Sequence, residues 1–234
     1  MNTEDVARER VLIVSGVPLI RRGVSSLITE SGRYEICGEA LNAHTARMLC
    51  ENEKPDLIVQ HAYPVLGEAM LLLRDFARLH RRARTLVIAP TEDAAIIQRM
   101  FSAGARGYIR FDDGDVLAAL DALAAGEVFL DAHVQRTLVR DFVSGELRTR
   151  TSAIDRLTPR ELCVFELIAR GHDTRSIAAK MCISTKTVET HRGKIQRKLR
   201  LRRRCELPLR AQQWLNGDAM RMRLAGIHEA TPQQ

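Results

Sequence analysis

Short apolar runs alternate with amphipathic stretches along the first 125 residues of the chain. The runs have the length of buried strands in a parallel sheet, and they predict strands at 10–15, 34–40, 57–59, 85–89 and 107–110. Apolar residues at helical spacing lie between and after them, and predict helices that begin at Pro18 and span 43–53, 66–81, 94–103 and 115–125. This alternation is typical of an α/β doubly wound, five-stranded parallel sheet with helices on both faces. In the first helix we expect Leu19, Val24 and Leu27 to face the sheet.

Helical spacing returns between residues 157 and 207, where the pattern predicts three short helices and the start of a fourth. Thr158 followed by Pro159 is typical of a helix start, and Gly171 closes that helix. Asp173 begins a second helix, and Ser184 caps a third one that extends to about residue 200. The segment is therefore expected to fold as an all-α domain.

The third of these helices has two unlike faces. Its apolar stripe consists of Val188, Ile195 and Leu199, which are spaced by seven and four residues. The rest of its surface is polar and mostly cationic, with Lys186, Thr190, Lys194, Arg197 and Lys198. A basic helix that follows another helix after a tight turn suits insertion into the major groove of DNA. The pattern by itself also allows a small helical bundle with a solvated basic face.

The charge of the chain is divided unevenly between its two halves. The 234 residues carry a net charge of +7 and are enough for two ordinary domains. Residues 1–147 contain 17 Lys and Arg against 21 Asp and Glu, a balance of −4, whereas residues 148–234 contain 19 against 8, a balance of +11. The basic half therefore favours a polyanionic partner, and its compact helical pattern favours double-stranded DNA over a membrane surface.

Several other classes of protein are disfavoured. No run of 18 apolar residues predicts a membrane span, and the polar N-terminus MNTEDVARER lacks the apolar core of a secretory signal. Five scattered cysteines without C-x-x-C spacing indicate reduced thiols of a cytoplasmic protein and no metal site. Cys163 and Cys182 occupy apolar positions, where we expect core thiols. Motifs such as G-x-G-x-x-G and G-x-S-x-G are missing, so we predict no cofactor and no enzymatic activity.

Three motifs of the basic half carry a family resemblance. They are T-P-R-E-L at 158–162, S-T-K-T-V-E-T-H at 184–191 and K-I-Q-R-K-L at 194–199, and they closely resemble the DNA-binding domain of LuxR-type (FixJ/NarL-like) transcription regulators. The resemblance implies a four-helix helix-turn-helix domain that binds double-stranded DNA as a homodimer. It also implies that a fourth helix, predicted at 206–215, contributes to the dimer contact.

Roles on the third helix follow from this resemblance and from the chemistry of the side chains. Phosphate contacts are expected from Lys186, Arg192, Lys194, Arg197 and Lys198. Thr187 and His191 are expected either to contact the DNA backbone or to pack within the domain. Positions that face base edges in relatives are occupied by Glu189, Thr190 and Gly193, where a Glu can accept from cytosine and a Thr can contact a thymine methyl. Glu189 has an alternative role in an ion pair with Lys186 or Arg192.

The acidic half resembles the receiver domain of LuxR-type response regulators through VLIV-x-x-x-PLIRRGV, PDLIV, GARGYI and ALAAGEVFL. A working receiver needs a phosphoacceptor aspartate, carboxylates for Mg²⁺, a hydroxyl residue and a lysine at the carboxyl ends of its strands. At those positions this chain has Ser15 and Gly16, then Gln60 or His61, then Ala89 and Phe111. The third-strand position is His61 when counted from Pro55 and Gln60 when counted from Pro64. We therefore predict an atypical receiver with a degenerate phosphorylation pocket and no metal.

These features divide the chain into a pseudo-receiver domain at 1–130, a linker helix and linker at 131–154, the helix-turn-helix domain at 155–217 and a tail at 218–234. The predicted function is a dimeric, DNA-binding transcription regulator of the response-regulator type that acts independently of phosphorylation. The alternative is an auxiliary interaction protein that binds DNA only as a heterodimer with a conventional response regulator. Protection of a DNA site by the purified protein alone distinguishes the two.

Overall fold

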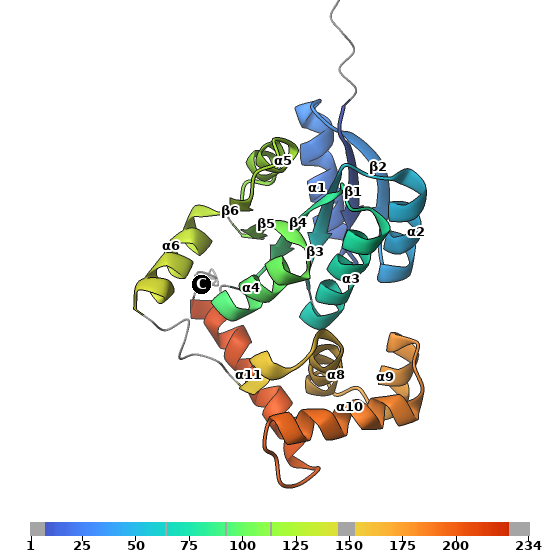
Figure 1. The fold of residues 1–234 in the computed structure, drawn as a ribbon, viewed down its shortest axis with the longest axis vertical. Coiled ribbons are helices and arrows are strands. Elements are labelled where there is room, and N and C mark those ends of the chain that lie inside the picture. Colours follow the sequence, from blue (N-terminus) through green and yellow to red (C-terminus); the bar gives the residue numbers. More distant parts are fainter. Residues whose placement is uncertain (1–7, 64, 92, 113, 145–152, 225–234) are drawn as a thin grey trace, which may run out of the picture. The chain divides into compact units, whose positions relative to one another are not determined.

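The computed structural model describes residues 8–63, 65–91, 93–112, 114–144 and 153–224, and for 217–224 it describes the backbone only. The chain forms two compact units (Figure 1), one made of nearly all residues up to 150 and the other containing residues 151–234.

The first unit is built on a parallel sheet with strand order β2-β1-β3-β4-β5-β6. Its strands are β1 (Arg10–Val14), β2 (Glu35–Ala40), β3 (Leu57–His61), β4 (Arg84–Ala89), β5 (Ala105–Arg110) and β6 (Phe129–Leu130). The five predicted strands are all present, and the doubly wound parallel fold is confirmed. The predicted number of five strands is wrong, because β6 adds a sixth beside Gly107 and Tyr108 of β5. A strand of two residues is too short for an alternation of apolar and polar positions to reveal it.

Among the described residues, the sheet is accompanied by the helices α1 (Pro18–Ser31), α2 (Ala43–Glu53), α3 (Leu66–Leu79), α4 (Ala94–Ala103), α5 (Val116–Ala124) and α6 (Ala132–Val143). Several begin at an acceptor side chain that takes up free backbone N–H groups, as Asn42, Asp93, Asp115 and Asp131 do. The α6 helix lies within the predicted linker, and residues 145–152 of that linker lie outside the described residues.

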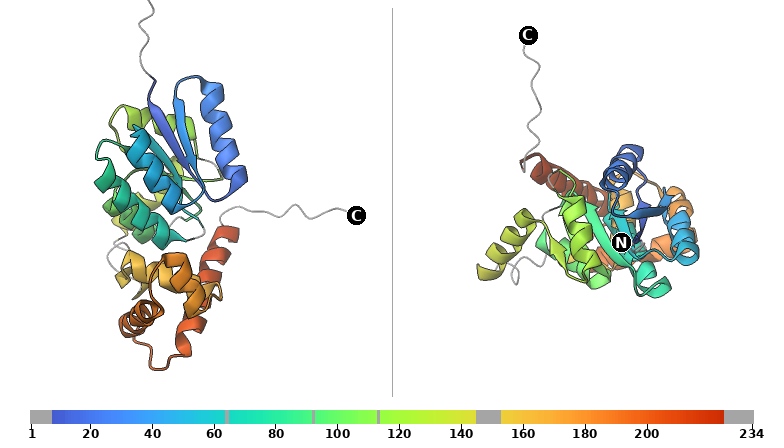
Figure 2. Two further views of the ribbon diagram at one scale, coloured as in Figure 1. Left: turned by 90° about the vertical axis from the view of Figure 1, so that its right-hand side faces the viewer. Right: turned by 90° about the horizontal axis from the view of Figure 1, so that it is seen from above.

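Successive residues of a strand pack into two different hydrophobic clusters, one on each face of the sheet. Val11 and Ile13 of β1 join a cluster that includes Val24 and Ile28 of α1 and Leu120 of α5. Leu12 and Val14, the intervening residues, join a cluster that includes Cys50 of α2 and Phe76 of α3. Because side chains alternate along a strand, the two faces of the sheet are covered by different helices (Figure 1, Figure 2).

The inner face of α1 differs from the prediction. Val24 is buried as expected, but Leu19 and Leu27 are 80% and 46% exposed. The residues that pack on the sheet are Val24 and Ile28, with Ile20 against the same cluster. They are spaced by four residues, so they form the stripe of the helix, and Leu19 lies outside it. The periodicity of the sequence predicts the position of this helix but not its rotation about its axis.

The second unit is helical throughout the described residues, with η1 (Ala153–Arg156), α8 (Pro159–Ala169), α9 (Thr174–Met181), α10 (Thr185–Lys198) and α11 (Glu206–Leu224). The predicted caps Thr158, Asp173 and Ser184 all accept a backbone N–H of the helix that follows. Helices α10 and α11 both pack on α8. The fourth helix is longer than predicted, because α11 continues from residue 215 to Leu224 and includes the first part of the predicted tail. Residues 225–234 lie outside the described residues.

Candidate nucleic-acid interface

Two buried side chains determine which face of α10 meets the solvent. Val188 and Ile195 are both fully buried, whereas Leu199, the third residue of the predicted stripe, is partly buried. The exposed residues of the helix are Thr185, Lys186, Glu189, Thr190, Gly193, Lys194 and Arg197. They include six of the ten predicted contact residues and carry three cations and one carboxylate. The remaining four, Thr187, His191, Arg192 and Lys198, are partly buried.

The turn before α10 sets the direction in which the helix leaves α9. Cys182 ends α9 in the left-handed conformation (φ 52°), and the N–H groups of Cys182 and Ile183 donate to the carbonyls of Ala179 and Ala178. Ser184 then accepts the N–H of Thr187 at 3.1 Å and opens α10. Cys182 is exposed, so the expectation of a core thiol is wrong for this residue and holds for the buried Cys163.

Thr187 and His191 are both partly buried in the second unit. The Thr187 hydroxyl lies 2.8 Å from the hydroxyl of Ser184, which makes it part of the helix cap. His191 is partly buried, and this burial lowers the pKa of its imidazole, so the neutral ring is favoured. Of the two roles left open by the sequence, the geometry therefore favours packing for both residues.

The carboxylate of Glu189 contacts two neighbouring side chains, those of Thr174 and Arg192. Its Oε1 accepts the hydroxyl of Thr174 on α9 at 2.9 Å and lies 3.7 Å from Nε of Arg192. Of the two intrahelical partners that were expected, the structure thus pairs Glu189 with Arg192. The contact with Thr174 ties the outward face of α10 to the preceding helix, which no spacing within α10 could indicate.

Lys198 is engaged by the domain itself. Its Nζ lies 2.6 Å from Oε2 of Glu161 and 3.0 Å from the carbonyl oxygen of Arg156. The Glu161 side chain is 4% exposed and also accepts the N–H of Thr158 at 2.8 Å, which completes a capping box at the start of α8. Burial alone would raise the pKa of the Glu161 carboxyl, but the hydrogen bonds from Lys198 and Thr158 outweigh it and hold the pKa below its ordinary value. These contacts favour a structural role for Lys198, and its predicted phosphate contact stays a prediction.

An exposed arginine cluster follows α10 and was given no role from the sequence. It consists of Arg200, Arg202, Arg203 and Arg204, all of which are exposed and lie between α10 and α11. Arg200 adopts φ 55°, a left-handed conformation that favours glycine. The run R-R-R at 202–204 is visible in the sequence, and this arginine cluster belongs to the candidate interface.

The degenerate pocket lies at the carboxyl ends of β1 and β3 in the first unit. Ser15 Oγ and His61 Nδ1 are 3.2 Å apart, and Ser15 Oγ also accepts the N–H of Val17 at 3.2 Å. Burial lowers the pKa of His61, so its neutral form is favoured. Gln60 points to the other face of the sheet, where its Nε2 donates to the carbonyl of Ala69 at 3.1 Å. The structure thus brings Ser15 and His61 together and leaves Gln60 apart from them.

The other predicted pocket residues, Ala89, Phe111 and Gly16, follow or end strands of the sheet. Ala89 is buried at the end of β4, opposite Arg110 of β5. Phe111 follows β5 and is 48% exposed. Gly16 follows Ser15, and a Cβ added there would lie 3.2 Å from the carbonyl oxygen of Leu41. Within the described ranges, no three His, Cys, Asp or Glu side chains are grouped as metal ligands would be, and no described helix is long and apolar enough to cross a membrane.

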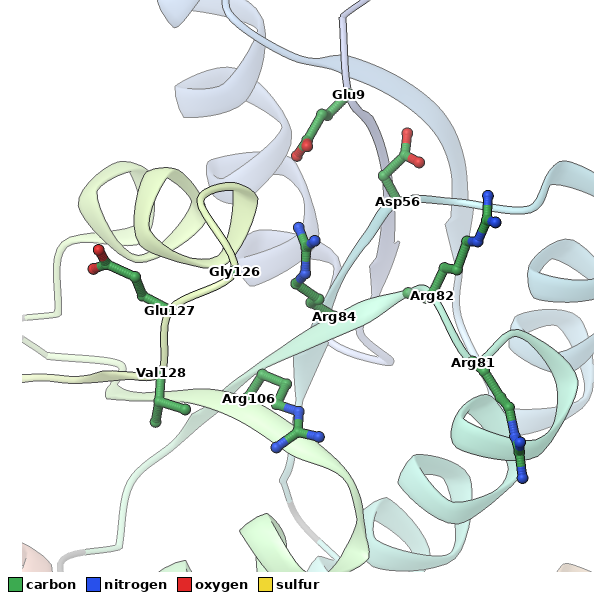
Figure 3. A pocket seen from close by; sticks show the side chains of 10 residues that line it. Glu9, Asp56, Arg81, Arg82, Arg84, Arg106, Gly126, Glu127 and Val128 are labelled. Atoms are coloured by element: carbon green, nitrogen blue, oxygen red, sulfur yellow. The ribbon is translucent and has the colours of Figure 1, made fainter.

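A separate hollow of about 580 Å³ lies at the amino ends of the strands, away from Ser15 and His61. Its charged lining is mixed, with Glu9, Asp56, Arg81, Arg82, Arg84, Arg106 and Glu127. In Figure 3 the guanidinium of Arg84 points toward the carboxylate of Glu9, whereas the carboxylate of Asp56, which accepts the N–H of Arg10, points away from both. Arg84 also donates to the carbonyls of Leu123 and Ala124 at 2.8 and 3.0 Å, which gives it a role in fixing the end of α5. None of the predicted site residues lines this hollow.

The comparisons with known proteins agree with this two-part architecture. Residues 155–211 match the family described as bacterial regulatory proteins, luxR family. The chain is 28% identical over 204 residues to the oxygen regulatory protein NreC of Staphylococcus aureus, a match that covers 85% of this chain and 94% of that protein. Its fold is similar to that of RcsB from Salmonella enterica serovar Typhimurium bound to a promoter, with a TM-score of 0.61, 21% identity, and 87% and 98% of the two chains covered. A LuxR-family two-component response regulator from Aurantimonas sp. SI85-9A1 is also similar, with a TM-score of 0.55 and 23% identity over 58% of this chain and 99% of that one.

Fold and interface together define a class of protein, in which a receiver-like domain precedes a helix-turn-helix DNA-binding domain. Within that class, residues 155–211 match the luxR family, and the chain is similar over most of its length to the regulatory protein NreC. The family resemblance seen in the motifs is therefore confirmed. The loss of the phosphorylation site and the residue roles on α10 stay predictions.

The contact of Lys198 with Glu161 gives a prediction for stability. Replacing Lys198 with Ala should leave a buried carboxylate without its charged partner and lower the free energy of unfolding of the second unit by about 2 kcal/mol. Urea unfolding followed by fluorescence of Trp214, the single tryptophan, measures this, because its ring packs on Phe165 of the same unit. The matched control is Lys194→Ala, which removes an exposed lysine of the same helix and should leave stability unchanged. Equal stability of both variants would contradict the assigned role.

Proposed function

We propose that this protein is a transcription regulator that binds double-stranded DNA by placing α10 in the major groove. The exposed face of α10 carries this proposal, because it presents Lys186, Lys194 and Arg197 outward on a domain that matches the luxR family. A helix with side chains is about 10–12 Å across, and the major groove is about 12 Å wide, so the two fit. RcsB, which is similar in fold, has been solved with promoter DNA, and this supports the proposal.

In this interface the cations have two locations. Lys186, Lys194 and Arg197 lie on α10, and the arginine cluster at 200 and 202–204 follows the helix. All are exposed, so each can reach a phosphate without losing a buried contact. Arg192 is partly buried beside Glu189 and serves more to hold the helix surface in place. Glu189, Thr190 and Gly193 lie between these cations and are the residues proposed to face base edges.

The DNA-bound form is proposed to be a homodimer. A two-fold dimer binds two similar half-sites one helical turn of DNA apart or a multiple of it, about 34–36 Å centre to centre. The fourth helix, α11, is the proposed source of the contact between DNA-binding domains. If the protein instead works as an auxiliary subunit, binding requires a conventional response regulator as its partner.

The receiver-like domain is proposed to act without aspartyl phosphorylation. Phosphoryl transfer needs a carboxylate nucleophile and a metal that neutralises the charge on the transferred group. At the strand ends this chain places the neutral pair Ser15 and His61, with Ala89 further along the same edge. A neutral hydroxyl–imidazole pair has no negative charge with which to hold Mg²⁺. The regulatory input must therefore act on this domain by another route.

The salt dependence of DNA binding tests the phosphate contacts. Lys194→Ala should weaken binding to every duplex and reduce the slope of log K against log[salt] by roughly one unit, because one counterion fewer is released. Fluorescence anisotropy with labelled duplexes at several salt concentrations measures both effects. Arg22→Ala, which removes an exposed cation of α1 in the other unit, is the control and should change neither. An unchanged slope in Lys194→Ala would show that α10 does not meet the DNA backbone as proposed.

Footprinting tests the homodimer. The purified protein first selects DNA sites from a random-sequence library, and the selected DNA is then footprinted with the same protein. Two protected half-sites in two-fold symmetry, and two protein chains per duplex by sedimentation, are expected. Protection that appears only after a conventional response regulator is added would favour the auxiliary role. A single protected half-site with one chain would rule out the dimer.

Incubation with acetyl phosphate and Mg²⁺ tests the receiver. We expect no phosphate on any peptide from residues 1–147 and no change in DNA affinity, because the phosphoacceptor carboxylate is missing. Mass spectrometry of the intact protein and its peptides provides the measurement, with a conventional response regulator treated in parallel as the positive control. An acid-labile phosphate adduct in this region would contradict the proposal.

A further inference from the structure

Gly193 lies inside α10, at a position where the fold gives no reason for a glycine. It is exposed, and its backbone does not adopt a positive φ. Beyond the neighbouring backbone of its own helix, a Cβ added to Gly193 would meet no atom within 4 Å. Glycine disfavours a helix relative to alanine, since it has more backbone freedom to lose on folding. Alanine would therefore suit the isolated domain better.

Thr190 lies three residues earlier, so it borders Gly193 on the same surface of the helix. Its hydroxyl donates to the carbonyl of Lys186 at 2.9 Å and is thereby turned back onto the helix. What an exposed Thr190 then offers to a ligand is mainly its methyl group. Gly193 adds an empty space beside that methyl. Together the two residues form an apolar notch in a face that otherwise carries the charged residues Lys186, Glu189, Lys194 and Arg197 and the polar Thr185.

The chemistry of the notch matches one group of the major groove. Thymine carries a methyl group at C5, the one apolar projection among the base edges of that groove, and the methyl group of a threonine is a usual partner for it. A base edge that meets the helix at Gly193 can approach closely because no Cβ stands in its way. Lys186, Lys194 and Arg197 are charged, so they suit phosphates or guanine rather than a methyl group.

We propose that the notch formed by Thr190 and Gly193 holds the 5-methyl group of a thymine and selects an A·T pair at one position of each half-site. The proposal rests on the proposed insertion of α10 into the major groove and adds one element of its sequence specificity. Gly193 acts by the space that it leaves open. Any larger residue at this position fills the space that the methyl group requires.

The test compares the full-length wild type with Gly193→Ala on a duplex selected by the wild type from random-sequence DNA, and on an unrelated duplex. Gly193→Ala should lower the affinity for the selected duplex roughly tenfold or more, the size expected when one good base contact is lost. Its affinity for the unrelated duplex should stay within about twofold, because phosphate contacts dominate there. The matched control is Gly23→Ala in α1, the same change at another exposed helical glycine whose Cβ would meet no atom within 4 Å, and it should leave both affinities unchanged.

Removing single methyl groups from the DNA identifies the occupant of the notch. In a set of duplexes each thymidine of the selected site is replaced in turn by deoxyuridine, which pairs as thymidine does but lacks the methyl group. At one position per half-site, deoxyuridine should weaken wild-type binding and restore most of the affinity that Gly193→Ala has lost. Trp214 fluorescence should show the variant folded, with a melting temperature equal to or higher than that of the wild type.

The outcomes separate this inference from the proposed function. If the wild type prefers its selected duplex and Gly193→Ala binds it equally well, the notch has no role and DNA binding stands. Weaker binding of Gly193→Ala that no deoxyuridine relieves would overturn thymine as the occupant. If the wild type prefers no duplex over another, both the notch and the proposed sequence-specific binding are overturned. An equal loss on both duplexes would mean that the alanine disturbs docking in general, and it would also reject the notch.

Discussion

The burial of Val188 and Ile195 is the constraint on which the DNA-binding unit depends. Both side chains are fully buried and lie seven residues apart, close to two turns of α10, so they fix the rotation of the helix about its axis. Turning α10 by one residue, about 100°, would expose them, at roughly 1.5–3 kcal/mol for each. The Ser184 cap holds the first turn, and the contact of Lys198 with Glu161 holds the last. The composition of the outward face is therefore a consequence of the packing inside.

The alternation of side chains along β1 and β3 has the same effect in the receiver-like unit. Ser15 and His61 meet because each continues the face of its strand that bears Ile13 and Val59. Carboxylates that lie close together at the ends of strands repel one another unless a metal ion offsets their charge. A phosphorylation pocket is therefore poorly stabilised when no metal is bound. A hydroxyl and a neutral imidazole instead satisfy each other at 3.2 Å. The carboxyl edge of the sheet is thus closed by a hydrogen-bonded pair that carries no net charge in its neutral form.

Periodicity and cap residues were sufficient to predict most of the fold. The strands and the helix starts at Thr158, Asp173 and Ser184 could be predicted because they depend on residues a few positions apart. What failed depends on contacts distant in sequence or on very short elements. The ion pair of Lys198 could not be predicted, because its partner Glu161 lies 37 residues away. The two-residue strand β6 gives no pattern, and the rotation of α1 depends on which side chains the sheet accepts.

The choice between His61 and Gln60 illustrates the same limit in the candidate pocket. Counting from Pro55 and counting from Pro64 gave different answers, and the sequence offered no way to decide. The sheet decides, because Gln60 shares its face of β3 with Ile58 and donates to Ala69, whereas His61 lies on the face that reaches Ser15. Which of two neighbouring residues lies at the pocket therefore depends on the face of the sheet from which its side chain projects.

Residues that contradict local backbone preferences are informative when nothing in the fold requires them. Gly193 weakens the interior of α10 although its Cβ would meet open space. Arg200 adopts φ 55°, where a glycine would be less strained. Gly193 has no side chain where alanine would suit the helix, and Arg200 has a charged side chain where glycine would suit the backbone. Gly193 lies on the exposed face of α10, and Arg200 lies directly after this helix. Preferences broken in this way at functional surfaces commonly serve recognition rather than stability. The surface proposed to meet DNA is therefore also the place where the sequence departs from what would make its helix most stable.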